Sequence, residues 1–368
     1  SGKSMTASAL MRLLPPGVQK GETFDLEVQV PARSNVASLR GGWLMETRLT
    51  EMAVMGNEIH DGHLLALGEG PVLVDPAASG EQERGALVHG RILGGGRALK
   101  SRPIGLVISP DDRSVSLSSQ IGTAVNRRFH SAAHGIQKGL ATPKTDEFIE
   151  LQVHPRYKDN IGRYIKAVLA TPLNEAPSEQ QSRLALLERQ LMEPITAASA
   201  AIRLEAIGKP SIKVLERGTR SESAETRFYA AEALAYLDEA AAAQPLAQIA
   251  RDEPAFRAYS LAALSAMEDS TALDELRNLL NATSAETRYG AFRAIWAKHP
   301  GDPAVRGESL GGKFSYHLIH TDGPPMVHVT RSFRPEIVLF GDDQRLTTPV
   351  VPSPNDSIGH RPCLFPPV

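Results

Sequence analysis

The hexapeptide Glu225-Thr226-Arg227-Phe228-Tyr229-Ala230 recurs as Glu286-Thr287-Arg288-Tyr289-Gly290-Ala291, with a weaker copy, Pro254-Ala255-Phe256-Arg257-Ala258-Tyr259, between them. The three arginines are 30 and 31 residues apart. Small residues three and six positions after each arginine keep one helical face thin enough for a neighbouring helix to approach closely. A large aliphatic residue follows each arginine by seven positions: Leu234, Leu264 and Ile295. A period of this length with helical spacing predicts a helical solenoid.

Each repeat has a second helical stretch, so its unit is a pair of helices. The second stretches are marked by the aliphatic residues of 212–215, 246–249 and 273–280. This pattern resembles HEAT-like repeats and covers residues 177–300, with an earlier degenerate unit at 197–208. Proteins of this architecture bind or scaffold more often than they catalyse.

The repeated arginines Arg227, Arg257 and Arg288 allow two interpretations. They could form a stripe that binds a ligand, or they could pair with carboxylates and helix ends between neighbouring repeats. One arginine at one fixed position per repeat favours the architectural role. We keep all three as candidates for an interface.

The overall composition is that of an ordinary folded protein. The chain has 368 residues, of which 42% are hydrophobic and 22% charged, so two or three cores are expected. The net charge of −2 and a pI near 6.6 give no long-range attraction to nucleic acid. No stretch is apolar for the length that crosses a bilayer, so we expect a soluble or peripheral protein without membrane insertion.

The single cysteine, Cys363, excludes an internal disulfide and a CxxC metal site. We expect no cofactor and no bound metal. The chain starts at Ser1 without an initiator methionine or an apolar leader, which suggests a mature product or an excised fragment. The amino-terminal residues do not indicate a cellular compartment.

The region before the repeats predicts a mixture of strands and helices. Alternation at 23–30 indicates a strand, and 86–93 indicates another that ends in a turn at Gly94-Gly95-Gly96. Further strands are expected at 104–108 and 148–153, and helices at 118–129 and 157–169. The fold class is therefore α+β.

The region after the repeats predicts a small β element. Strands at 314–319 and 327–330 flank Asp322-Gly323-Pro324-Pro325 and favour a hairpin, and 336–340 adds a third strand. The segment 349–368 is rich in proline and forms a tail.

Three segments near the amino end carry a family resemblance. Lys20–Val28 has the pattern K-x-G followed by a strand, Ser38-Leu39-Arg40-Gly41-Gly42 reads S-L-R-G-G, and Leu44–Leu49 is a second strand. Together they look like the flagellar P-ring protein family. The order of the later elements, from the helix ending at Phe129 to the helix at 157–169, is also similar to that family. The resemblance spans residues 15–172 and extends to 312–348.

The resemblance implies a fold and a role. A β-rich P-ring-like module, 1–172, would be interrupted by a HEAT-like helical solenoid at 177–300, completed by the strands of 312–348 and followed by the tail at 349–368. The implied protein is a periplasmic structural subunit that forms a ring with copies of itself. Its implied partners are the flagellar rod and the outer-ring proteins, and no catalysis is implied.

The S-L-R-G-G segment supplies further interface candidates. Gly41 and Gly42 suit a bulge or a close approach of the backbone to a neighbour. Arg40 could pair with a carboxylate of its own fold or of an adjacent subunit. The intramolecular role is favoured, because paired glycines in strands usually serve local geometry.

The glycine motifs that suggest phosphate binding are weak. Gly2-Lys3-Ser4 resembles the end of a P-loop, but the first glycine and the preceding strand are missing. Gly94-Gly95-Gly96-Arg97 could hold an anion with backbone amides, but without a βαβ context a flexible turn is favoured.

The histidines do not form a convincing metal site. His317 and His320 are three apart on a predicted strand and point to opposite faces, and His60 and His63 flank a predicted turn at Asp61-Gly62. Together with His328, they are better explained as surface or hairpin residues. No catalytic motif stands in a credible context.

Two alternatives to the ring subunit stay open. The chain could be a HEAT-type adaptor that binds a protein partner along the repeats without forming a ring. Less favoured is a lyase or hydrolase with a site between the repeats and the hairpin. Self-association separates the first two, because a ring subunit presents head-to-tail surfaces and an adaptor can stay monomeric.

Overall fold

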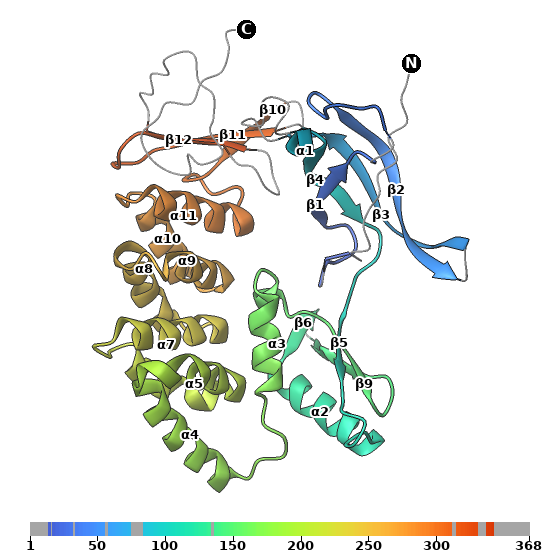
Figure 1. The fold of residues 1–368 in the computed structure, drawn as a ribbon. Coiled ribbons are helices and arrows are strands. Elements are labelled where there is room, and N and C mark those ends of the chain that lie inside the picture. Colours follow the sequence, from blue (N-terminus) through green and yellow to red (C-terminus); the bar gives the residue numbers. More distant parts are fainter. Residues whose placement is uncertain are drawn as a thin grey trace. The chain divides into compact units, whose positions relative to one another are not determined.

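Alternating apolar residues build a four-stranded antiparallel sheet near the amino end (Figure 1). Its strands are β1 (Thr23–Gln29), β2 (Trp43–Met55), β3 (Glu58–Pro71) and β4 (His89–Ala98), in the order β1-β4-β3-β2. One face carries a core of Val28, Val30, Leu39, Leu44, Val72 and Ile92. The strand predicted at 23–30 is confirmed.

This computed structural model describes residues 14–15, 17–31, 34–55, 58–74, 84–133, 136–310, 314–329 and 336–341. The chain divides into two compact units. The sheet unit comprises residues 1–102, 307–320 and 324–368, and the helical unit comprises 103–306 and 321–323. The domain boundaries expected at 172–177 and 300–312 stay predictions. Gly2-Lys3-Ser4, the tail at 349–368 and Cys363 lie outside the described residues.

The turn predicted at Gly94-Gly95-Gly96 is wrong, because β4 continues through these glycines to Ala98. A short helix, α1 (Arg84–Leu87), precedes the strand instead. The register between β1 and β4 shifts between Phe24 and Leu26, and the glycines lie opposite this irregularity. A Cβ atom on Gly96 would come within 2.6 Å of the Phe24 ring, so the glycines make room for packing.

The turn predicted around Asp61-Gly62 is also wrong. His60 and His63 both belong to β3, which pairs with β2 from Trp43↔Pro71 to Met55↔Glu58. Three register irregularities interrupt this long pair and let it bend.

The strands after the repeats form a separate sheet, ordered β10-β11-β13-β12. They are β10 (Gly307–Leu310), β11 (Phe314–Ile319), β12 (Met326–Val329) and β13 (Glu336–Phe340). The three predicted strands are present, but the predicted hairpin is wrong. β13 lies between β11 and β12, parallel to β11 and antiparallel to β12.

The helical unit begins with a small α+β part. Its three-stranded sheet has the order β5 (Ile104–Val107), β9 (Phe148–Leu151) and β8 (Ala141–Pro143). Strands β6 (His130–Ala133) and β7 (Ile136–Gly139) pair with each other. Helix α2 (Val115–Arg128) packs on β8 and β9, and Asn126 exchanges two hydrogen bonds with the backbone of Ala141, at 2.7 and 2.8 Å.

The predicted helix at 157–169 begins later than expected. A turn of 3-10 helix covers Pro155–Tyr157, and α3 spans Ile161–Leu169 after the N-cap residue Asn160. The Asn160 side chain accepts a hydrogen bond from Arg163 N at 3.1 Å, which fixes this start.

The predicted repeat region is an array of helices in two layers (Figure 1). One layer contains α5 (Pro194–Ile207), α7 (Ala224–Leu237), α9 (Arg257–Ala266) and α11 (Ala285–Lys298). The other contains α4 (Pro177–Met192), α6 (Ile212–Gly218), α8 (Ala243–Asp252) and α10 (Ser270–Leu279). The helix pairs predicted from the sequence are therefore present, and the α+β class is confirmed.

Candidate functional site

The S-L-R-G-G segment forms a tight turn ahead of β2. Gly42 N donates to Leu39 O at 2.9 Å, and Gly41 has a φ of +66°. A Cβ atom on Gly42 would come within 2.8 Å of Leu39 O. Both glycines therefore serve the local geometry of the turn, and Arg40 lies exposed at its tip. A role of this turn in an interface stays a prediction.

Two of the repeat arginines bind backbone carbonyls at the end of the preceding helix or loop. Arg227 Nη1 donates to Ser221 O at 3.0 Å and Glu222 O at 2.7 Å. Arg257 Nε donates to Ala250 O at 3.0 Å, and its Nη1 pairs with Glu286 of the next repeat at 2.9 Å. Arg227 thus fixes the loop before its own helix, and Arg257 connects α9 to α8 and to the start of α11. A role of these arginines in an interface stays a prediction.

The third repeat arginine, Arg288, is buried in the last helix pair. Burial lowers the pKa of its guanidinium. Gly323 lies beside it, and a Cβ atom there would come within 2.9 Å of Arg288 Nη1. Arg288 thus lies where residues 321–323 return to the helical unit, with Thr321 Oγ1 donating to Leu280 O at 2.8 Å.

A buried charge cluster that the sequence reasoning missed connects α3 to the helical array. Arg163 donates to Glu205 Oε2 of α5 from Nε at 2.9 Å and from Nη2 at 2.5 Å. Its Nη1 pairs with Glu232 of α7. Tyr157 OH donates to Glu205 Oε1 at 2.7 Å. One guanidinium therefore binds two carboxylates from neighbouring helices of the array.

Aromatic rings surround this cluster. The Arg163 guanidinium carbon lies 4.6 Å from the centre of the Tyr236 ring, and Tyr157 stacks on Tyr236 at 4.7 Å. Burial raises the pKa of Tyr236 to about 12 and raises the pKa of Glu232 above its usual value of 4.5, although Arg163 opposes the latter shift.

A second ion pair lies at the end of α7. Arg156 Nη2 donates to Asp238 Oδ2 at 2.8 Å, and Asp238 Oδ1 accepts from Glu268 N at 2.7 Å. Asp238 has a φ of +67° as the residue that ends α7. The sequence contains one signal for these missed ion pairs: a single glutamate or aspartate within, or directly after, an alanine-rich helix. Such a carboxylate is costly to bury without a partner.

The histidines in the described part of the chain do not gather into a catalytic arrangement. His317 is buried in β11, so the expectation of a surface position is wrong for it, and both His317 and His328 lie opposite Val338 of β13. Within the described residues, no group of three or more His, Cys, Asp or Glu side chains could hold a metal ion.

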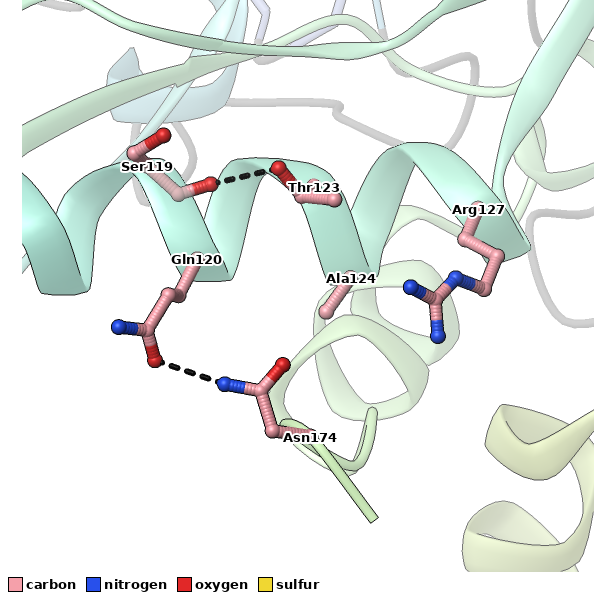
Figure 2. Close-up of a pocket in the computed structure, with 6 residues that line it drawn as sticks. All are labelled: Ser119, Gln120, Thr123, Ala124, Arg127 and Asn174. Carbon is pink, nitrogen blue, oxygen red and sulfur yellow. Dashed lines mark hydrogen bonds between the residues drawn. The ribbon is translucent and has the colours of Figure 1, made fainter. Parts of the chain in front are cut away.

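The surface hollows of the helical unit are small. Figure 2 shows one on α2, where Gln120 accepts a hydrogen bond from Asn174 at 2.9 Å and Thr123 Oγ1 donates to Ser119 O. Ala124 and Arg127 complete its lining. These groups include no nucleophile paired with a base. None of the described helices is long and apolar enough to cross a membrane.

Comparison with known proteins identifies one family. The model of the flagellar P-ring protein family matches residues 3–192, which is just over half of the chain and includes all elements from β1 to α4. A search of curated proteins gave no match.

Proposed function

Since the chain belongs to the flagellar P-ring protein family, we propose that it is a structural subunit that joins copies of itself into a ring around the flagellar rod. Proteins of this family are ring-forming, periplasmic components of the flagellar basal body, and the family is not one of enzymes. The observation that carries the proposal is the family match over β1 to α4.

The helical array extends this subunit with a protein-contact surface. We infer that its two-layered helix pairs act as HEAT-like repeats do, which bind proteins along extended faces. The contacts of Arg227 and Arg257 stabilise the array and leave its outer faces available to a neighbouring subunit, the rod or an outer-ring protein. Arg40 of the exposed turn is a further contact residue in this proposal.

The buried Arg163 cluster supports a mechanical role. It fixes α3, which lies within the family match, to α5 and α7, which lie beyond it. A force on the array would thus be transmitted to the family module through buried charge-assisted hydrogen bonds as well as through the chain.

Analytical ultracentrifugation over a wide concentration range, followed by negative-stain electron microscopy of large species, tests the proposal. We expect closed rings of one diameter. A strict monomer at every concentration, with and without isolated rods, would contradict the proposal and favour the adaptor that binds a partner along its repeats.

A further inference from the structure

We propose that the outer edge of strand β5 pairs with β5 of a second copy of this chain, antiparallel and about a two-fold axis. The contact joins two sheets of the order β5-β9-β8 into one continuous sheet. This inference goes beyond the proposed ring, because a two-fold contact joins copies in twos, whereas the contacts of a ring are head to tail.

The outer edge of β5 carries backbone groups that point away from the sheet. Ile108 N donates to Glu147 O at 2.8 Å, so these residues form a hydrogen-bonded pair directly after the β5–β9 register. Such pairs alternate with non-hydrogen-bonded ones along antiparallel strands, so Gly105 and Val107 direct their N–H and C=O groups away from β9. Both residues are exposed, and these groups have no hydrogen bond within the described residues. This edge is therefore open to another strand.

The opposite edge of the same sheet, formed by β8, is closed. Asn126 of α2 binds both backbone groups of Ala141, at 2.7 and 2.8 Å, and Pro143 has no N–H to donate. β5 of one copy therefore cannot continue onto β8 of the next. Pairing of the two open edges ends at two copies.

The side chains of β5 fit a copy of the same strand. In the two-fold register that pairs all the outward backbone groups, Gly105 of each copy lies opposite Val107 of the other. The Phe148 ring lies over Gly105, since a Cβ atom there would collide with its Cε2. Val107, which is 75% exposed, packs against that ring in the space that glycine leaves. A small residue thus meets a large one on both sides of the axis.

The charges around β5 also favour a second copy. The strand itself, Ile104–Val107, carries none, so pairing with its own copy sets no like charges side by side. Arg102 precedes the strand by two residues, and the exposed Asp111 and Asp112 follow it. Antiparallel pairing places the start of each strand near the end of the other, so opposite charges approach each other at both ends of the contact. Because the strand is short, we expect a weak pair that dissociates on dilution.

Removing the outward N–H of Val107 in the full chain tests the pairing. Val107→Pro deletes this donor and places a ring where the second strand approaches, while proline is tolerated on an edge strand. Val115→Pro is the matched control, because Val115 is also 75% exposed and is the first residue of α2, where proline is favoured. In sedimentation equilibrium, we expect Val107→Pro to raise the concentration for half-dimerisation at least about ten-fold and Val115→Pro to change it by less than about two-fold. Equal dimerisation of the two variants would overturn the inference.

A single-cysteine cross-link tests the two-fold register without proline. In a Cys363→Ser background, Leu106→Cys lies on the axis, where the facing Cα atoms are about 4.5 Å apart and within reach of a disulfide. Ile104→Cys is the matched control, because it lies on the same side of the strand but about 14 Å from its own copy. We expect disulfide-linked dimers to form at least about ten-fold faster with Leu106→Cys.

Equal rates of cross-linking for the two cysteine variants would overturn the two-fold register. Monomers at every concentration, together with equal rates, would overturn the second copy as the occupant. The edge would then be assigned to an extended segment of another protein.

Discussion

His154 is a half-buried titratable residue beside two arginines. Burial is the largest cause that lowers its pKa from 6.5 to about 4, and Arg156 and Arg128 add to it. The folded protein therefore holds a neutral imidazole at a pH where the unfolded chain is already protonated. Stability from this group is present above pH 6.5 and is lost as the pH falls toward 4.

We expect the free energy of unfolding to fall by about 1–2 kcal/mol between pH 7 and pH 5 relative to His154→Asn, after allowance for partial exposure. Asparagine can keep the acceptor that His154 Nδ1 offers to Arg156 N at 3.2 Å, but it does not titrate. Urea unfolding followed by circular dichroism at both pH values measures the difference. An equal change in the free energy of unfolding between pH 7 and pH 5 for the two proteins would show that the pKa of His154 is not lowered.

A second prediction for a single residue concerns Arg163. Arg163→Leu leaves Glu205 and Glu232 buried without their cation, and we expect it to cost about 3–5 kcal/mol in urea unfolding. Arg217→Leu is the matched control, because it breaks the exposed pair with Glu188, at 2.6 Å, and should cost less than about 1 kcal/mol. Similar losses for both variants would contradict the structural role of the cluster.

Single residues were only partly predictable from the sequence. Arg227 and Arg257 make intramolecular contacts of an architectural kind, and the interface role kept open for them stays a prediction. The Arg163 cluster was missed, because a repeat pattern does not show which residue from outside the array binds Glu205 of α5 and Glu232 of α7. Arg163 lies outside the period altogether.

At the scale of elements, the close packing of helices depends on small residues. Gly218 ends α6, and a Cβ atom there would lie 2.7 Å from Ala230 Cβ and 2.8 Å from Leu191 Cδ2. Ala230 Cβ is fixed to its backbone, so the helices cannot accommodate an added methyl group without moving apart.

We therefore expect Gly218→Ala to lower the free energy of unfolding by about 1–3 kcal/mol. Gly162 in α3 is the matched control, since a Cβ atom there meets nothing within 4 Å. Gly162→Ala should be neutral or stabilise the protein by up to about 1 kcal/mol through helix propensity. Thermal unfolding of both variants tests the contrast, and a stabilising Gly218→Ala would refute the tight contact.

Element types were more predictable than their pairing. The helical period and the alternation of apolar residues predicted most helices and strands. The glycine run in β4 and the segment around Asp61-Gly62 were wrongly predicted to be turns. In both places the backbone continues in a strand whose register is irregular. The order β10-β11-β13-β12 depends on contacts between distant residues, which a local pattern such as Asp322-Gly323-Pro324-Pro325 does not contain.

At the scale of the molecule, the array should respond to damage locally. In a stack of helix pairs, each pair contacts only its neighbours, so a perturbation fades along the array. Leu187 in α4 and Leu276 in α10 are both buried and lie near opposite ends.

We expect Leu187→Ala to raise amide hydrogen exchange in α4 to α6 and Leu276→Ala to raise it in α9 to α11. Each variant should leave the other end within about two-fold of the unmodified chain. Mass-spectrometric hydrogen exchange of the full chain measures this. An increase spread evenly over the whole array in either variant would indicate one cooperative block.

The division of the chain into units also determines when each segment of the sheet unit is synthesised. The sheet unit is discontinuous, and roughly 200 residues of helical unit are translated between its first segment and its second. At about 5–20 residues per second, this delay lasts about 10–40 s. During that interval, the nascent β1–β4 segment has left the ribosome while the later strands of the same unit do not yet exist. Until those strands arrive, the β1–β4 segment lacks the rest of its compact unit, so the risk of aggregation is greatest before translation ends.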